Sequence, residues 1–219
     1  RDLHLSIRRQ RQMCIRDSRV WILDRPGSVQ SELRVGHVGV ARTTPNYLPL
    51  SIGNLLLGGT FTSRLNLNLR ERNGFTYGVR SRFGFRSQPG PFQVSTAVGN
   101  EVTAPAVREI LSELESLVVD GAKREEVDAA RDYAAGVFGL HLETAGQIAS
   151  RLNQIVVYGL PDDYYHLHRD NIRAVSTEQV TSAVKEHIRP EEVQVIIVGD
   201  AERIVGSVDA LGLGPLEVV

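Results

Sequence analysis

The chain has 219 residues, 42% of them hydrophobic and 23% charged, with 25 Lys and Arg against 26 Asp and Glu and a formal net charge of -1. This near-neutral balance disfavours nucleic-acid binding, which needs an excess of basic side chains. No apolar run approaches the roughly 20 residues that cross a bilayer, and a single cysteine, Cys14, gives no disulfide framework.

The first eighteen residues do not resemble part of a folded domain. The run RRQRQMCIRDS, residues 8–18, is the translation of a transposon-type sequencing adapter, and residues 1–4 match a second adapter. We therefore expect residues 1–18 to be an artefact rather than a basic N-terminal arm, and the chain to be a fragment without its natural start. The other 20 basic and 24 acidic residues give a formal net charge of -4. Residues 19–219 are then expected to form a single domain.

Two strands and a helix are predicted at the start of this domain. Residues 20–23 and 30–40 have the alternating pattern of strands, and the turn residues Pro26 and Gly27 separate them. Residues 47–57 are apolar, and their pattern predicts a helix that ends at the glycine pair that follows.

A second short helix, a turn and a third strand follow. Leu65 and Leu69 predict the helix, Asn73-Gly74 its left-handed end, and Tyr77 the start of the strand. Alternation along this strand places two sets of side chains on opposite faces, namely Tyr77, Val79, Phe83 and Phe85 on one and Arg80, Arg82 and Arg86 on the other.

A hairpin and a mostly helical second half complete the pattern. Residues 88–91 turn the chain into a partner strand over 92–98, which predicts an antiparallel hairpin. Apolar spacing and capping signals then predict helices over 107–118, from about 124, over 145–158 and 162–174, and from the capping box Ser176–Gln179 to about 188. Residues 193–198 have the composition of a buried strand. This order predicts an α+β fold, an antiparallel sheet with helices packed on one face.

Arg70 and Tyr77 are the candidate site residues. They are seven positions apart around a helix-ending glycine, so their guanidinium and phenol are expected to lie near each other. Both groups donate hydrogen bonds and stay protonated at neutral pH, so together they could hold a peptide carbonyl and stabilise an oxyanion forming on it. The structural alternative, which spacing alone favours, is that Arg70 complements the helix dipole and Tyr77 is a core tyrosine.

Other polar residues have simpler interpretations. Asn66 and Asn68 could shape the neighbouring surface, but the preferred interpretation is that they only solvate and end their helix. The arginine face of the third strand could attract acidic stretches of a peptide substrate, but a solvated surface is the commoner explanation of such a face. No metal site is expected, because His166 and His168 on one helix would point about 200° apart. The chain also lacks a Gly-x-Ser-x-Gly elbow, a Walker loop and a Gly-x-Gly-x-x-Gly turn.

Three segments carry a family resemblance: VWILDRPGSVQSELRVGHVGV (20–40), GGTFTSRLNLNLRERNGFTYGV (58–79) and VQVIIVGDAERI (193–204). They resemble the C-terminal domain of pitrilysin/insulinase-type zinc peptidases, the M16 family that includes mitochondrial processing peptidase. The resemblance implies a LuxS/MPP-like metallohydrolase fold, and it implies that Arg70 and Tyr77 contact substrate beside a zinc site. The family's metal motif, His-x-x-Glu-His, is absent from this sequence.

On this resemblance, the chain is expected to be the substrate-holding C-terminal domain of an M16-like zinc metallopeptidase, inactive alone. It would assist peptide-bond hydrolysis at a Zn²⁺ held by a missing N-terminal domain or by a partner subunit. Its partners would be a peptide substrate and a catalytic M16 domain or subunit, in a homo- or heterodimer. The alternative is a non-catalytic scaffold subunit derived from such a peptidase. The compartment stays open between bacterial periplasm and cytoplasm.

Overall fold

The computed structural model describes residues 19–219, so the predicted adapter segment, residues 1–18, lies outside the described residues. One six-stranded sheet runs through the domain in the order β3-β4-β2-β5-β1-β6. Its strands are β1 (Val20–Asp24), β2 (Gln30–Val38), β3 (Val79–Phe83), β4 (Pro91–Gly99), β5 (Gln194–Gly199) and β6 (Leu216–Val218).

The sheet is mixed rather than wholly antiparallel. The strands β3, β4, β2 and β5 pair antiparallel, including the predicted β3–β4 hairpin. By contrast, β1 pairs in parallel with both β5 and β6. Parallel neighbours cannot be joined by a tight hairpin, and here most of the helices lie between β1 and β5 in the chain.

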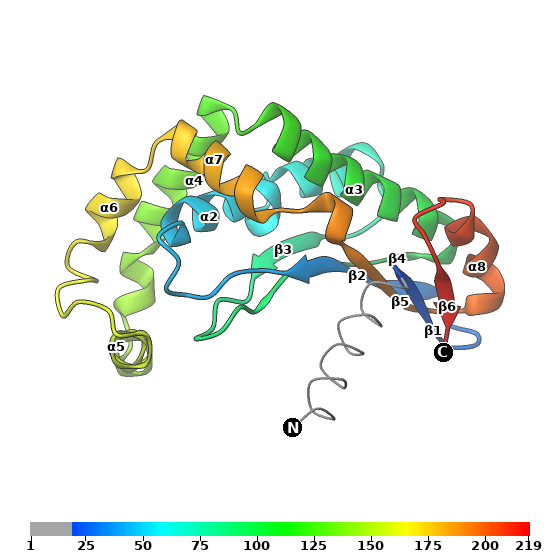
Figure 1. The fold of residues 1–219 in the computed structure, drawn as a ribbon, viewed down its shortest axis with the longest axis horizontal. Helices are drawn as coiled ribbons and strands as arrows, with labels where there is room; N and C mark the ends of the chain where they lie inside the picture. The colour runs from blue at the N-terminus through cyan, green and yellow to red at the C-terminus, as the bar shows by residue number, and fades with distance from the viewer. Residues whose placement is uncertain (1–18) are drawn as a thin grey trace, which may run out of the picture.

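Helices cover one face of this sheet, as predicted (Figure 1). They are α2 (Tyr47–Asn54), η1 (Leu55–Gly59), η2 (Asn66–Arg72), η3 (Asn100–Val102), α3 (Thr103–Asp120), α4 (Arg124–Val137), η4 (Gly139–Leu142), α5 (Ala145–Tyr158), α6 (His168–Ala174), α7 (Thr177–His187), η5 (Pro190–Glu192) and α8 (Ala201–Asp209). α2, α3 and α7 lie over the sheet, α8 lies beside the edge formed by β1 and β6, and α5 lies apart at the opposite end.

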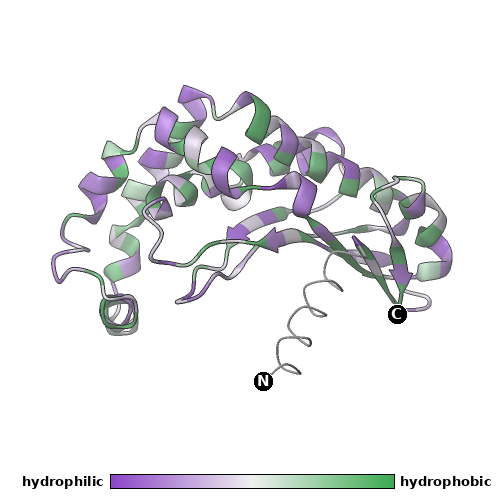
Figure 2. Ribbon diagram, in the orientation of Figure 1, coloured by the Kyte–Doolittle hydropathy of each residue, from purple (hydrophilic) through white to green (hydrophobic). Residues whose placement is uncertain are grey.

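The core fills the space between the helices and the covered face of the sheet. Alternate residues of β2 are buried, including Leu33, Val35 and His37, and the apolar stripe of α3 is buried from Val107 to Leu117. Hydrophobic and hydrophilic residues accordingly alternate along the strands and helices in Figure 2. The helices and the sheet therefore enclose a hydrophobic core, in the α+β class that the sequence predicts.

Four elements differ from prediction. The helix expected over 162–174 begins only at His168, because residues 162–166 form turns in which Tyr164 and His166 donate to carbonyls three residues earlier. β3 begins at Val79 rather than at Tyr77. The elements α8 and β6, which pack against the β1 edge, were not predicted.

Candidate functional site

The segment between η2 and β3 carries Tyr77, and its first turn is the predicted one. Gly74 has φ +64°, the left-handed conformation that ends a helix most easily at glycine. The next residue, Phe75, donates its backbone N–H to the carbonyl of Leu69 at 2.8 Å and packs its partly buried ring against the core. The turn is therefore fixed to the helix on both sides of the glycine.

Asn66 holds the far end of this segment. Its Nδ2 donates to the carbonyls of Val79, at 2.9 Å, and Thr60, at 3.0 Å, while its Oδ1 accepts the Val79 N–H at 3.1 Å. The side chain is only 6% exposed. The expectation that this asparagine only solvates and ends a helix is wrong, because it joins η2 to the start of β3.

Asn68 plays a similar part on the other side of the helix and is also buried. Its Nδ2 donates to carboxylate oxygens of Glu109 and Glu113 on α3, at 2.9 and 2.7 Å. Its Oδ1 accepts from the Nδ2 of Asn73 at 2.6 Å, within the turn itself. The simple interpretation is wrong here too, since Asn68 connects the turn to the longest helix of the domain.

Tyr77 projects from this anchored segment into solvent. Its side chain is 95% exposed, and within residues 19–219 its hydroxyl makes no hydrogen bond and its ring no aromatic contact. The alternative of a core tyrosine is therefore wrong. The reason is that Asn66 occupies the backbone groups of Val79, and the Thr76 hydroxyl donates to the Gly78 carbonyl at 3.0 Å, so the chain turns before the strand begins.

Arg70 lies at the end of η2 beneath an aromatic ring. The carbon of its guanidinium is 3.9 Å from the ring centroid of Phe61, an exposed side chain that sequence reasoning missed. Its Nη1 forms an ion pair with Glu71 Oε1 at 3.3 Å. The two groups are not aligned for a hydrogen bond, so this enclosed nitrogen has no hydrogen-bond acceptor. In the described part of the chain no contact joins Arg70 to Tyr77, and their cooperation stays a prediction.

The histidines give no metal cluster. His166 lies in a turn, and His168 begins α6, where its ring lies among Phe138, Tyr164 and Tyr165. Burial, with smaller contributions from Arg151 and Arg42, lowers the pKa of His168 to about 4. Among residues 19–219 no group of three His, Cys, Asp or Glu side chains is placed to hold a metal ion.

The arginine face of β3 has the predicted orientation. Arg80 and Arg82 are exposed while Val79, Ser81 and Phe83 are buried, and β3 is an edge strand. Exposed arginines on an edge oppose pairing with other sheets.

In the described region no helix is long and apolar enough to span a membrane.

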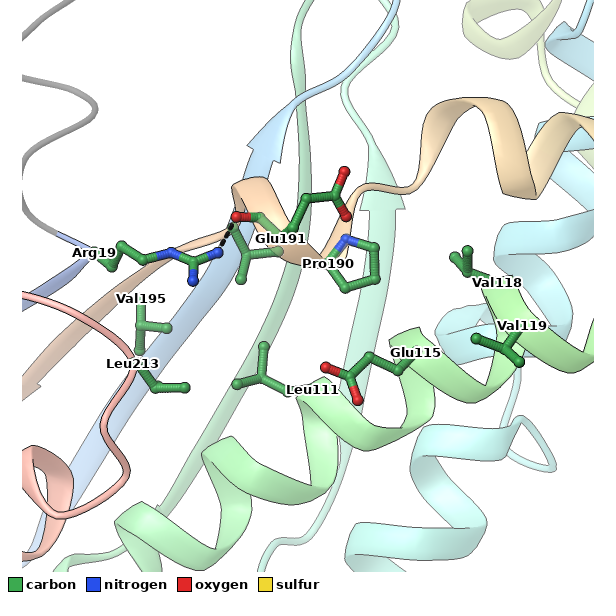
Figure 3. Close-up of a pocket in the computed structure, with 10 residues that line it drawn as sticks. Arg19, Leu111, Glu115, Val118, Val119, Pro190, Glu191, Val195 and Leu213 are labelled. Carbon is green, nitrogen blue, oxygen red and sulfur yellow. Dashed lines mark hydrogen bonds between the residues drawn. The ribbon is translucent and has the colours of Figure 1, made fainter.

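A cavity of about 400 Å³ lies on the helical side of the sheet, and its lining does not include Arg70 or Tyr77 (Figure 3). Leu111, Val118 and Val119 of α3 form its apolar wall, and Arg19, at its rim, donates to the carbonyl of Glu191. Glu115 and Glu191 are the acidic residues in the lining. None of the predicted site residues lines this cavity.

Comparison with known proteins gives the same family in sequence and in structure. Residues 10–133 match the family model described as the peptidase M16 inactive domain. An uncharacterized zinc protease of Mycobacterium bovis is 30% identical over 169 residues, which are 74% of this chain and 38% of that protein. A protein of Helicobacter pylori named non-peptidase homolog YmxG is 27% identical over 154 residues, 68% of this chain and 34% of that protein.

A solved structure has the same fold. The crystal structure of a peptidase M16 inactive domain from Pseudomonas fluorescens superimposes with a TM-score of 0.78 at 26% identity, over 84% of this chain and 43% of that one. This chain thus spans less than half the length of each of these three relatives.

Proposed function

Because this chain belongs to the M16 peptidase family and is its inactive C-terminal domain, we propose that it holds the peptide substrate for a zinc-bearing catalytic domain. The zinc would lie on another part of the natural polypeptide or on a partner subunit. The described residues of this domain do not fit a zinc ion, since no cluster of ligands occurs among them.

The exposure of Tyr77 on an anchored segment carries this proposal. A fully solvated tyrosine forgoes the burial of a large ring, and the segment that presents it is fixed by the buried Asn66 and by Phe75. The phenol is therefore available to donate a hydrogen bond to the carbonyl oxygen of a peptide as negative charge develops there.

Arg70 would act as a second donor, toward the substrate backbone. Phe61 covers its guanidinium, and one of its nitrogens is enclosed without a hydrogen-bond partner. Its ion pair with Glu71, at 3.3 Å, is not an aligned hydrogen bond, so this nitrogen can still donate to a carbonyl once the ring moves or once substrate replaces it. In this proposal Tyr77 stabilises the reacting carbonyl and Arg70 positions the chain beside it.

The exposed surface of helix α5 is evidence for contact with a partner domain. The inner side of the helix, on which Ile155 is half-buried, also carries polar groups. Gln154 accepts from the Tyr165 hydroxyl at 2.8 Å, and the guanidinium carbon of Arg151 lies 5.7 Å from the centroid of the Tyr165 ring. Its apolar residues Ile148, Leu152 and Val156, at i, i+4 and i+8, are all exposed, Val156 by 81%. A continuous apolar stripe on the outside of an amphipathic helix marks a protein–protein contact. We assign the catalytic domain to this surface.

The proposal is tested by Tyr77→Phe in the full-length protein with its catalytic domain. Loss of one oxyanion donor is expected to lower kcat for peptide cleavage about 10²-fold. The matched control is Tyr133→Phe, at a half-exposed tyrosine of α4, which should leave kcat unchanged. Equal kcat for wild type and Tyr77→Phe would reject a catalytic part for this phenol.

A second candidate is a non-catalytic scaffold subunit, and the similarity to the non-peptidase homolog of Helicobacter pylori favours it. A scaffold has no use for a solvated tyrosine on a fixed segment, which is why we prefer the peptidase. An assembly that is intact and Zn²⁺-supplied but cleaves no peptide would favour the scaffold.

A further inference from the structure

Among residues 19–219, Arg42 is a buried arginine without a counter-ion. It follows β2 and is only 5% exposed. Its guanidinium carbon lies 3.4 Å from the centroid of the Tyr47 ring and 5.2 and 5.7 Å from those of Tyr164 and Tyr158. Nη2 donates to the Tyr164 hydroxyl at 2.9 Å. Aromatic faces and a neutral hydroxyl are therefore its neighbours.

The hydrogen-bonding capacity of this guanidinium is mostly unused. Within residues 19–219 no carboxylate lies within 4.0 Å of it, and its Nε is enclosed without a partner. Arg64, whose side chain is 11% exposed, is by contrast bound in bidentate fashion by Glu126, at 2.7 and 2.6 Å. Ring faces offset only part of the cost of burying a cation, and full compensation normally takes a carboxylate.

A cavity of about 390 Å³ adjoins Arg42, within the range of small-ligand pockets. Its polar lining comes from hydroxyl and amide side chains, namely Thr43, Thr44, Tyr47, Tyr164, Asn171 and Gln179. Arg42 is the only charged residue among those that line it. The cavity also lies at the first turn of α2, the positive end of that helix dipole, where Asn46 makes no side-chain capping bond.

We propose that this cavity binds a carboxylate through Arg42. One guanidinium neutralises one negative charge, and its planar fork matches the two oxygens of a carboxylate. A phosphate, which carries about 1.5 to 2 negative charges at pH 7, would leave an excess that no lysine or second arginine of the lining offsets. The carboxylate belongs either to a small organic acid or to the C-terminus of a peptide. This inference is independent of Arg70 and Tyr77.

The test is a titration of the full chain with acetate, in which binding is monitored by the NMR chemical shifts of the Tyr47 and Tyr164 rings. Acetamide, a neutral molecule of the same shape, is the control ligand. Saturable binding of acetate is expected, with acetamide at least 10-fold weaker. A short peptide with a free C-terminus and its C-terminal amide separate the two sources. Tighter binding of the free acid than of acetate identifies a peptide terminus, and equal or weaker binding identifies a small acid.

The variant Arg42→Gln should lose acetate binding at least 10-fold, while the matched charge change Arg82→Gln, on the exposed face of β3, should keep it. The wild-type comparison of acetate with acetamide stands even if Arg42→Gln fails to fold. The proposal is overturned if acetate does not saturate, if acetamide binds equally well, or if inorganic phosphate binds more tightly than acetate.

Discussion

Replacing Asn66 by alanine should loosen the segment that presents Tyr77. The asparagine supplies both bonds that the backbone N–H and C=O of Val79 make toward η2, and it also holds the carbonyl of Thr60. Each buried polar group left without a partner costs about 1–3 kcal/mol. Because the Thr60 carbonyl and a relaxed strand end can partly recover bonds to water, we expect Asn66→Ala to lower the free energy of unfolding by about 3 kcal/mol.

The assay is urea unfolding together with amide hydrogen exchange at Val79. Exchange of the Val79 N–H should accelerate more than that of Val94 in the centre of β4, because only the first amide loses its acceptor. The control is Asn153→Ala on the exposed side of α5, which should change stability by less than about 0.5 kcal/mol. A loss as small as the control's, or unchanged exchange at Val79, would refute the reasoning.

Three further predictions concern charge and surface. Burial raises the pKa of Glu126, but the hydrogen bonds from Arg64 and from the Lys123 backbone, together with the positive charges of both residues, outweigh it and the pKa is lowered. Glu126→Gln should therefore cost about 2 kcal/mol of stability at pH 7, and this difference should shrink as pH falls below 4.5 and the carboxylate protonates in the wild type. Burial lowers the pKa of His168 to about 4 in the folded protein, whereas in the unfolded chain the imidazole protonates near 6.5. The free energy of unfolding should therefore decrease, by up to about 3 kcal/mol, as pH falls from 6.5 to 4. His168→Phe should flatten that part of the curve measured by urea unfolding, and an equally steep curve would contradict the assignment. On α5, Leu152→Glu should leave the unfolding midpoint of this domain unchanged but weaken binding of a catalytic domain at least 10-fold in a pull-down titration, whereas the neighbouring Asn153→Asp should not. Equal binding by both would contradict the docking surface.

Much of the fold follows from local pattern. The β3–β4 hairpin, α3 and the capping box of α7 are all where periodicity and capping residues predict them. The parallel pairing of β1 with β5 joins residues about 175 apart, so no local signal determines it. α8 has only Ile204 and Val208 as large buried side chains, and its helical pattern is too short to stand out.

The site was less predictable than the fold. The strand pattern correctly separates Val79 from Arg80 but extends too far back to Tyr77, because the bonds that Asn66 makes to Val79 span thirteen residues. The sequence does contain a signal for the role of Asn66. Asparagine is unfavourable in the interior of a helix, so two asparagines at 66 and 68 suggest side chains that form hydrogen bonds outside the helix. The ring of Phe61 lies over Arg70 from the segment that follows the kink at Gly58 within η1, and its position has no comparable signal in the sequence.

The contrast between a fixed backbone and a free side chain bears on why this domain would be inactive by itself. Hydrogen-bond donors stabilise a transition state most when they are already oriented, so that reaction requires no reorganisation. The backbone beside Tyr77 meets that condition, but no hydrogen bond or ring contact from residues 19–219 orients its phenol, and Arg70 is covered by Phe61. In the proposed function, orientation of the phenol and displacement of the ring would come from bound peptide or from the facing domain. On this view the domain supplies a prepositioned backbone, and its two donors reach their working geometry only in the assembled enzyme.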